Sequence, residues 1–521
     1  MKSVFEQRLR AVEDNGGGAI IAGGGRGIEK ECLRITPDGL ISQAQHPRAL
    51  GSALTNRYIT TDYSEALLEF VTPPESSSWA AMQYLCDLHQ YTYGAIGDEL
   101  LWPYSMPCRL RSEADIPVAR YGTSNVGRMK TIYREGLGHR YGRYMQAISG
   151  IHFNYSVPDS YWQLVANSDV YTGSPLTSPQ SEAYLGLVRN VRRLDWMLLY
   201  LFGASPAVCS SFLHGMQHDL HELGDGTCIG PWATSLRMSD LGYQNSSQSA
   251  LVVSANSLEE YIRDLSAATA TPHDEYVRMG VKKGSEYLQL NVNQLQIENE
   301  FYSTVRPKRV ARSGERPTSA LRRAGVEYVE LRSLDLNPFE PAGIGQQQQK
   351  FLEAFLLYCL LEDSPPVSAA EQAGLQQNNL DVAREGRKPG LMLLRPGGPA
   401  GLQEWAREIC TNMRPVCQLL DAAGGEGYVQ VLDSQVAAID DPGLTPSAGL
   451  LSELDAAGEP FALYGLEVAR RYSEYFLGLQ DDFNAHGQLL ETEAAESLER
   501  QKRIESTDEI ALDDYLARYY A

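Results

Sequence analysis

The sequence predicts an α+β fold: strands and helices are interspersed up to about residue 340, and helices alone follow. Short segments of the first part alternate apolar and polar residues with a period of two, which is typical of a strand with two unlike faces. Long, irregular gaps separate these segments, so repeated β–α–β winding is not implied. The last third instead shows helical periodicity between Gly- and Pro-rich turns.

Each element can be placed along the chain from these patterns. We predict strands at 28–35, 66–73, 150–157, 287–297 and 326–336, and helices at 79–99 and 183–201. A turn-rich break occupies 336–350, and further helices are predicted at 348–361, 403–423, 461–479 and 488–506. We therefore expect an α+β region over residues 1–345, which carries the clustered reactive residues, and a mainly helical region over 346–521 packed on it.

Charge and composition argue against several classes of protein. The 521 residues carry a formal net charge of −21, which disfavours nucleic-acid binding because phosphate neutralisation needs a basic surface. The first 15 residues lack the apolar core of a signal peptide, and the longest apolar run, at 351–361, is too short to span a membrane and contains Glu353. The eight cysteines form no C-x-x-C motif. We expect a cytoplasmic protein with reduced thiols and with neither nucleic acid nor membrane as partner.

The glycine-rich stretch at 23–27 raises the question of a phosphate-binding loop. No G-x-G-x-x-G register fits, because Lys30 occupies the third glycine position counted from Gly25 and Gly27. No G-x-x-x-x-G-K-[ST] motif occurs either. The glycines therefore predict a turn that leads into a strand.

The strand after this turn carries two carboxylates on one face. Residues i and i+2 of a strand point the same way, so Glu29 and Glu31 share a face and Lys30 points to the other. Such a pair repels unless a cation lies between its members. Glu69 stands in the apolar segment "LLEFVT", where a carboxylate usually has a partner or a metal ion. Taken singly, each of these residues is usually explained by solvent exposure or by an ordinary ion pair, and not by a metal site.

Two further strands add to this set. His152 shares a strand face with Asn154 and Ser156, and Glu330 shares one with Arg332. Four carboxylates and an imidazole on strands are a ligand set that suits Mg²⁺ or Mn²⁺. A guanidinium beside them suits a phosphoryl oxygen. The combination favours phosphoryl transfer from ATP to a carboxylate, in which metal ions must screen two anions.

A second, weaker metal-binding pattern is the segment "HGMQHDLHEL". It places His214, His218 and His221 on one face if the segment is helical, which is a possible zinc site. The segment is polar and lacks the glutamate of the H-E-x-x-H motif. We favour an exposed helix or loop.

Longer motifs identify a family. The sequence resembles the proteobacterial glutamate–cysteine ligases, also called γ-glutamylcysteine synthetases, from about residue 20 to 340 and more weakly beyond. The resemblance is carried by "RGIEKECLRI", "GSALTNRYITTDYSEALLEFVTP", "YGTSNVGRMKTIYREGL", "QAISGIHFNYS", "LQIENEFYSTVRPKR" and "GVEYVELRSLDLNPF". It implies a curved, largely antiparallel sheet that forms a catalytic funnel like that of glutamine synthetase, with helices outside.

The resemblance also implies roles for the clustered residues. Glu31 and Glu69 would hold a metal ion near the glutamate substrate, and Glu29, His152 and Glu330 would hold one on the ATP phosphates. A third ion would share Glu29 and Glu330, so two or three Mg²⁺ are expected, with Mn²⁺ as a possible replacement. Arg332 would brace the transferred phosphoryl group and bind ATP together with Arg134, and the catalytic residues would be Arg332, Glu330 and Glu29.

The amino-acid substrates would bind elsewhere in the same motifs. Tyr63 stands where the family often has phenylalanine. The expected substrate-binding residues are Tyr63, Tyr133, Arg134, Leu137, Gln146, Arg237, Tyr243 and Tyr302.

The implied reaction joins the γ-carboxylate of L-glutamate to the amine of L-cysteine through γ-glutamyl phosphate, at the expense of ATP. This is the first step of glutathione biosynthesis. Two alternatives stay open: a γ-glutamyl ligase for another amine, and a non-catalytic glutathione or amino-acid sensor on the same scaffold. The resemblance further implies a monomer that glutathione inhibits.

Overall fold

A seven-stranded antiparallel sheet is the centre of the computed structural model, which describes residues 3–166, 179–242, 248, 251–312, 314–479 and 484–520. The strands run in the order β11-β12-β5-β1-β3-β2, and β4 pairs with one end of β1. They span β1 Gly25–Ile35, β2 Ile59–Thr61, β3 Leu67–Val71, β4 Leu100–Leu101, β5 Ile151–Ser156, β11 Val305–Lys308 and β12 Tyr328–Leu334. Every pair in this sheet is antiparallel, which confirms the predicted α+β class.

The glycines before β1 form the predicted turn. Gly23 has φ = 79°, a left-handed conformation that favours glycine. At Gly24 a Cβ atom would lie 2.6 Å from the Tyr155 hydroxyl, so the neighbouring strand leaves no room for a side chain. The chain then enters β1 at Gly25.

One face of the sheet is apolar and covered by helices. Ile28, Cys32, Phe70, Phe153 and Leu331 belong to one buried cluster. The covering helices are α2 (Ser78–Ala95), α5 (Pro179–Phe202) and α9 (Gln346–Leu361), which contact β1, β12 and one another. Burial of these side chains fixes the strand register, because a slip of one residue would turn the apolar set outward.

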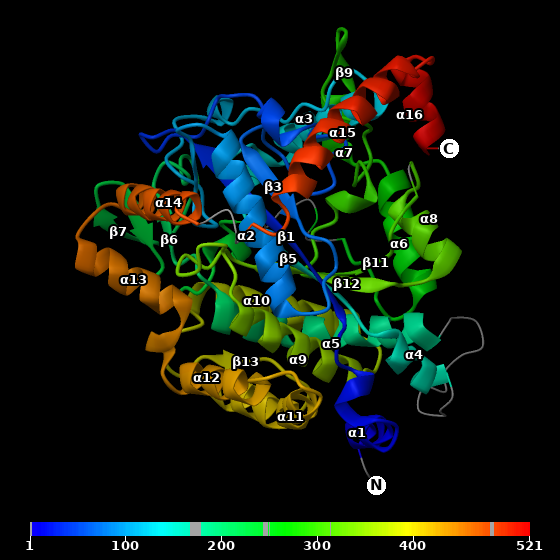
Figure 1. The fold of residues 1–521 in the computed structure, drawn as a ribbon, viewed down its shortest axis with the longest axis vertical. Coiled ribbons are helices and arrows are strands. Elements are labelled where there is room, and N and C mark those ends of the chain that lie inside the picture. Colours follow the sequence, from blue (N-terminus) through cyan, green and yellow to red (C-terminus); the bar gives the residue numbers. More distant parts are fainter. Residues whose placement is uncertain are drawn as a thin grey trace.

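The remaining helices surround this layer (Figure 1). Helices α11 and α12 pack on α9, α14 packs on α2, and α16 packs on α3. The helices are α1 Val4–Asp14, α3 Asn125–Tyr141, α4 Asp159–Ala166, α6 Leu258–Ala270, α7 Asp274–Met279, α8 Pro317–Ala324, α10 Ala369–Glu385, α11 Leu402–Ala422, α12 Tyr428–Asp440, α13 Pro446–Ala457, α14 Phe461–Leu477, α15 Gly487–Ser506 and α16 Leu512–Tyr520. In the parts of the chain with described coordinates, no helix is both long and apolar enough to cross a membrane. The boundary at residue 345 stays a prediction.

Small sheets lie outside the main one. They are formed by β6 (Ala207–Cys209), β7 (His221–Gly224) and β8 (Thr227–Ile229), by β9 (Lys282–Lys283) and β10 (Glu286–Tyr287), and by β13 (Met392–Leu393) and β14 (Ala400–Gly401). The exposed loop favoured for the three histidines is confirmed, and the alternative of one helical face is not formed: His214 lies in a turn, His218 in irregular chain and His221 at the start of β7, all exposed.

The strand predicted at 287–297 is also wrong, since only Glu286–Tyr287 is extended in a ladder. Side-chain amides replace ladder partners in this segment. Gln296 accepts a hydrogen bond from the Leu290 amide at 2.9 Å, and Gln289 donates to the carbonyls of Tyr276 and Gly280. Alternating polar residues therefore serve local turns here instead of one face of a strand.

A buried ion pair links the sheet to the C-terminal helices. Arg26 on β1 pairs with Glu353 on α9, and both side chains are almost completely buried. The Tyr428 hydroxyl on α12 donates a hydrogen bond to the same carboxylate. The Glu353 carboxylate inside the apolar run 351–361 is thus paired with a guanidinium from β1, more than 300 residues earlier in the sequence.

We expect Glu353→Ala to lower the free energy of unfolding by about 3–5 kcal/mol, because it leaves the Arg26 guanidinium buried without its partner. Urea denaturation of the variant and the parent protein measures this. The double variant Arg26→Met/Glu353→Leu removes both charges and should lose clearly less stability. Equal losses in the single and double variants would contradict an electrostatic origin.

Candidate active site

The polar face of the sheet gathers the residues predicted from the four strands. In an antiparallel ladder, directly opposed residues project from the same face. Glu31 on β1 opposes Glu69 on β3, and Glu29 opposes His152 on β5. Glu330 on β12 opposes Asn154, two residues beyond His152 on β5. The register alone therefore collects the four carboxylates and the imidazole.

Three of these side chains are close enough to share one cation. His152 Nδ1 lies 3.0 Å from Glu29 Oε2 and 3.8 Å from Glu330 Oε1. One ligand atom from each of the three residues lies within 4.8 Å of the others, a group found nowhere else among the residues with described coordinates. The side-chain amide of Asn154 also orients Glu29, because its Nδ2 donates a hydrogen bond to Oε1 at 2.9 Å.

Glu330 is surrounded by cations although it is buried. Arg332 Nη1 lies 3.1 Å from Oε1, while Lys308 Nζ lies 3.4 Å from Oε2. Burial acts to raise the pKa of Glu330, but Lys308, Arg332, His152 and Arg306 outweigh it and hold the pKa well below its usual range. The buried Oε2 atom accepts no hydrogen bond within the described structure and faces the charges of Lys308 and Arg306, whereas Oε1 is the oxygen on the side of His152.

The pKa of Glu29 is lowered as well. Burial acts to raise its pKa, but the hydrogen bond with His152 and the charges of His152 and Lys308 bring the pKa below its usual value despite the repulsion from Glu330. Hard oxygen donors with low pKa values and one imidazole are a fitting ligand set for Mg²⁺ or Mn²⁺.

The pKa values of Glu31 and Glu69 are shifted in the opposite direction, upward. The Gly150 amide donates to Glu31 Oε2 at 2.7 Å, and His152 Nε2 lies 3.8 Å from Oε1. Burial nevertheless raises the pKa of Glu31. The pKa of Glu69 is raised well above its usual value by burial and by the charges of Asp62, Glu29 and Glu31. Among the described residues no lysine or arginine forms an ion pair with either carboxylate, and a second dication would supply that countercharge.

Arg237 is buried next to the backbone of Arg332. Its Nη2 donates to the backbone carbonyl of Arg332 at 2.8 Å, and its Nη1 lies 3.7 Å from Asp335. The guanidinium lies directly against Gly150, where a Cβ atom would come within 2.1 Å of Nη2. Glycine at 150 is therefore a requirement of close packing.

Most of the predicted substrate-binding residues form one group around Tyr302. Gln146 Nε2 donates to the Tyr302 hydroxyl at 3.3 Å, so these two are together. Tyr63 and Leu137 are buried in one apolar cluster that Tyr133 and Tyr302 also contact. Arg134 lies at the edge of the acidic face, with Nη2 3.8 Å from Asp62 Oδ1. Tyr243 lies outside the described residues.

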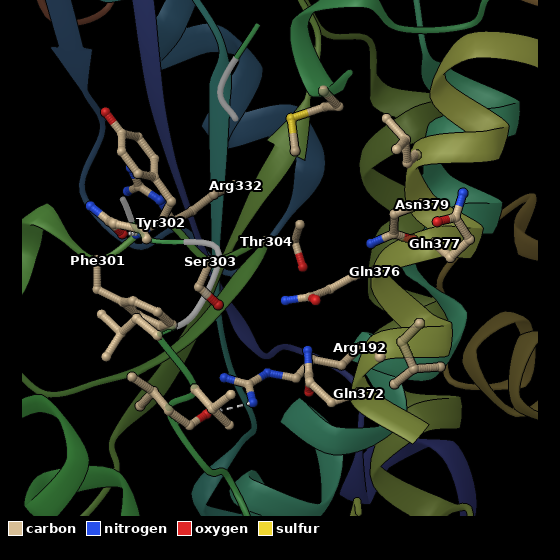
Figure 2. Close-up of a pocket in the computed structure, with 18 of the residues that line it drawn as sticks. Arg192, Phe301, Tyr302, Ser303, Thr304, Arg332, Gln372, Gln376, Gln377 and Asn379 are labelled. Carbon is tan, nitrogen blue, oxygen red and sulfur yellow. Dashed lines mark hydrogen bonds between the residues drawn. The ribbon is translucent and has the colours of Figure 1, made fainter. Parts of the chain in front are cut away.

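A cavity of about 390 Å³ opens beside His152 and Arg332. Its opposite wall is α10, from which Gln376 extends toward Thr304, with Arg192 and Gln372 below them (Figure 2). That α10 lines a cavity was not predicted, because a segment as polar as "EQAGLQQNNL" resembles an ordinary solvated helix. Lys308 was not predicted either, although the alternation of Arg306 and Lys308 in "VRPKR" is the signal of a basic strand face.

Comparison with known proteins identifies the family of this chain. A profile of the glutamate–cysteine ligase family matches residues 9–382. The glutamate–cysteine ligase of Alcanivorax borkumensis is 50% identical over 522 residues, covering 99% of this chain and 99% of the relative. That of Azotobacter vinelandii is 47% identical, covering 100% of this chain and 99% of the relative.

Two solved structures share the fold. The crystal structure of a glutamate–cysteine ligase from Francisella tularensis in complex with AMP superimposes with a TM-score of 0.89 at 36% identity, over 96% of this chain and 98% of that one. A bifunctional glutathione synthetase from Pasteurella multocida gives a TM-score of 0.69 at 26% identity, over 90% of this chain and 55% of that one. The profile match over most of the chain, together with the end-to-end identity to two curated relatives, shows that this chain belongs to the glutamate–cysteine ligase family.

Proposed function

We propose that this protein uses ATP to join the γ-carboxylate of L-glutamate to the amine of L-cysteine, the first step of glutathione biosynthesis. The observation that carries the proposal is the Glu29–His152–Glu330 group beside Arg332, set at the edge of a cavity of nucleotide size. The reaction proceeds in two steps: the γ-carboxylate takes the γ-phosphoryl group of ATP, and the amine then displaces phosphate from the acyl phosphate.

The donor sets support two or three Mg²⁺ ions, with Mn²⁺ as an alternative. Glu29, His152 and Glu330 would hold one at the ATP phosphates, Glu31 and Glu69 one at the glutamate carboxylate, and Glu29 with Glu330 a shared one. Bound there, the metal ions neutralise the two anions that phosphoryl transfer brings together. Arg332 adds a fixed positive charge for the transferred group, and its position is held by the pairing with Glu330.

The remaining residues position the substrates. The nucleoside of ATP fits the cavity wall built from α10, where Gln376 and Thr304 offer hydrogen-bonding groups (Figure 2). Tyr63, Tyr133, Leu137, Gln146 and Tyr302 form the side of the site assigned to cysteine, and Arg237 and Arg134 supply positive charge for substrate carboxylates. On the family resemblance, the enzyme acts as a monomer in the cytoplasm and is inhibited by glutathione.

Release of ADP in the presence of Mg²⁺, ATP and glutamate tests the function directly when the acceptor is varied at subsaturating concentration. Cysteine should support far faster release than ammonia, alanine or 2-aminobutyrate. Equal rates with ammonia would contradict the assignment to cysteine. A complete lack of ADP release with every acceptor would favour the sensor alternative.

Glu69→Gln and Glu330→Gln should each lower kcat/KM by about 100-fold or more, because each removes a metal ligand. Their effects on stability should be opposite. Because the pKa of Glu69 is raised by folding, its ionised form costs stability at neutral pH, and the glutamine variant should melt higher. Because the pKa of Glu330 is depressed, its charge stabilises the fold above the unfolded pKa and this contribution is lost on acidification, so its glutamine variant should melt lower.

Thermal melting at pH 7.5 in the presence of a chelator measures these shifts, since chelation removes the contribution of bound metal ions. Shifts of the same sign in the two variants would contradict the electrostatic division of the site.

Gln376→Ala should raise the KM for ATP by roughly 3- to 10-fold, the effect of losing one neutral hydrogen bond, and leave the KM for cysteine unchanged. Glu385→Ala is the matched control, because Glu385 lies on the same helix but is not among the residues that line the cavity, and it pairs with Lys388 at 2.9 Å. Steady-state kinetics with ATP as the varied substrate distinguishes the two variants. An unchanged KM for ATP in Gln376→Ala would remove this residue from the nucleotide site.

A further inference from the structure

Helix α3 carries two cations, Lys130 and Arg134, that both interact electrostatically with Glu69 of the acidic face. Lys130 and Arg134 are four residues apart and therefore lie on the same side of the helix. Both lie over the ring of Tyr121, with Lys130 Nζ 5.2 Å and the Arg134 guanidinium carbon 4.6 Å from its centroid. Like charges at this spacing destabilise a helix unless something nearby compensates them.

Arg134 is held by its surroundings. Its Nε donates to the Asp62 carbonyl and its Nη1 donates to the Lys130 carbonyl at 3.1 Å. Among the described residues, the acceptor recorded for its Nη2 is the carboxylate of Asp62 at 3.8 Å, which is too long for a hydrogen bond. The Nη2 donors of this guanidinium are therefore available to a ligand.

Lys130 has no such support. Its ammonium group makes no hydrogen bond and no ion pair within the portion of the chain that the structure describes, although the residue is half-buried. Burial and the charge of Arg134 together lower the pKa of Lys130 to about 8, although the charge of Glu69 acts in the opposite direction. Lys308, the other lysine near the acidic face, does have an ion-pair partner, because its Nζ lies 3.4 Å from Glu330.

A structural explanation would make Lys130 a countercharge for Glu69. A countercharge would be expected within about 4 Å, as the cations around Glu330 are. The Glu69 carboxylate, like the Lys130 ammonium, takes part in no hydrogen bond or ion pair within the described structure. An ammonium and a guanidinium on the same side of one helix, both over one ring and neither fully supplied with acceptors among the described residues, form a site for an anion.

We propose that Lys130, together with Nη2 of Arg134, binds the α-carboxylate of an amino-acid substrate. The inference rests on the proposed function, because it requires an amino-acid substrate at the acidic face. Glutamate and cysteine both carry an α-carboxylate, and either one would accept hydrogen bonds from the two cations. Lys130 is then a positioning residue that determines specificity and takes no part in bond making.

The variant Lys130→Met tests this, since methionine keeps the apolar stem and removes the charge. The KM for one of the two amino acids should rise by about 10- to 100-fold, the effect of losing a charge-assisted hydrogen bond, with a smaller change in kcat. Cysteamine lacks the carboxylate of cysteine, and 4-aminobutyrate lacks the α-carboxylate of glutamate. The analogue of the substrate that Lys130 binds should be used equally well by variant and parent.

A second readout is thermal melting without activity. The free variant should melt at the same temperature as the parent or higher, because an unpaired ammonium contributes no stability. The rise in melting temperature that the affected amino acid causes in the parent should be lost. Lys388→Met is the matched control, since Lys388 is exposed and pairs only with Glu385, and Lys130→Gln serves the same comparison if the methionine variant does not fold.

Unchanged KM values for both amino acids would overturn the proposal, as would a lower melting temperature with unchanged KM, which is the signature of a countercharge. A parent enzyme that forms no γ-glutamyl product would instead overturn the proposed function. The two failures are therefore distinguishable.

Discussion

Repulsion among four carboxylates on one sheet face is the constraint around which this molecule is built. Glu29, Glu31, Glu69 and Glu330 are brought together by strand register, and none can move away without breaking the ladder. The protein balances the repulsion unevenly. Cations from β11 and β12 hold the pKa of Glu330 low, and His152 on β5 together with Lys308 holds that of Glu29 low, whereas burial raises those of Glu31 and Glu69. One end of the face is thus compensated by cationic side chains, and the other end is the one that the proposed metal ions and substrate would compensate.

The apolar face makes this concentration of charge possible. Phe70, Phe153 and Leu331 lie on the same strands as the acidic residues and are packed under α2, α5 and α9. Their burial offsets the electrostatic cost of the opposite face, and it also fixes which carboxylates oppose each other. Residues that never meet a substrate therefore determine the geometry of the site, which explains why the acidic residues occupy central strands of the sheet and not mobile loops.

Much of this could be predicted from the sequence, because strand periodicity records side-chain direction. The period of two placed Glu29 with Glu31 and Glu330 with Arg332, and the structure keeps these pairings. Which strands are neighbours is not encoded locally, so the opposition of Glu31 and Glu69 and the role of Lys308 required the fold. The segment 287–297 has the right period and is no strand, because its amides bond to nearby backbone. The wall formed by α10 was missed for a related reason: a glutamine that faces a cavity has the same sequence pattern as one that faces solvent.

The ion pair between Arg26 and Glu353 has a consequence for how the chain is made. Arg26 is synthesised about 330 residues before the carboxylate that neutralises it in the folded core. At ordinary rates of translation this interval lasts tens of seconds. During that time the central strand carries a guanidinium that cannot be buried at low cost. The nascent sheet must therefore stay open or be shielded until α9 leaves the ribosome, so completion of the acidic face is delayed until that helix has been translated.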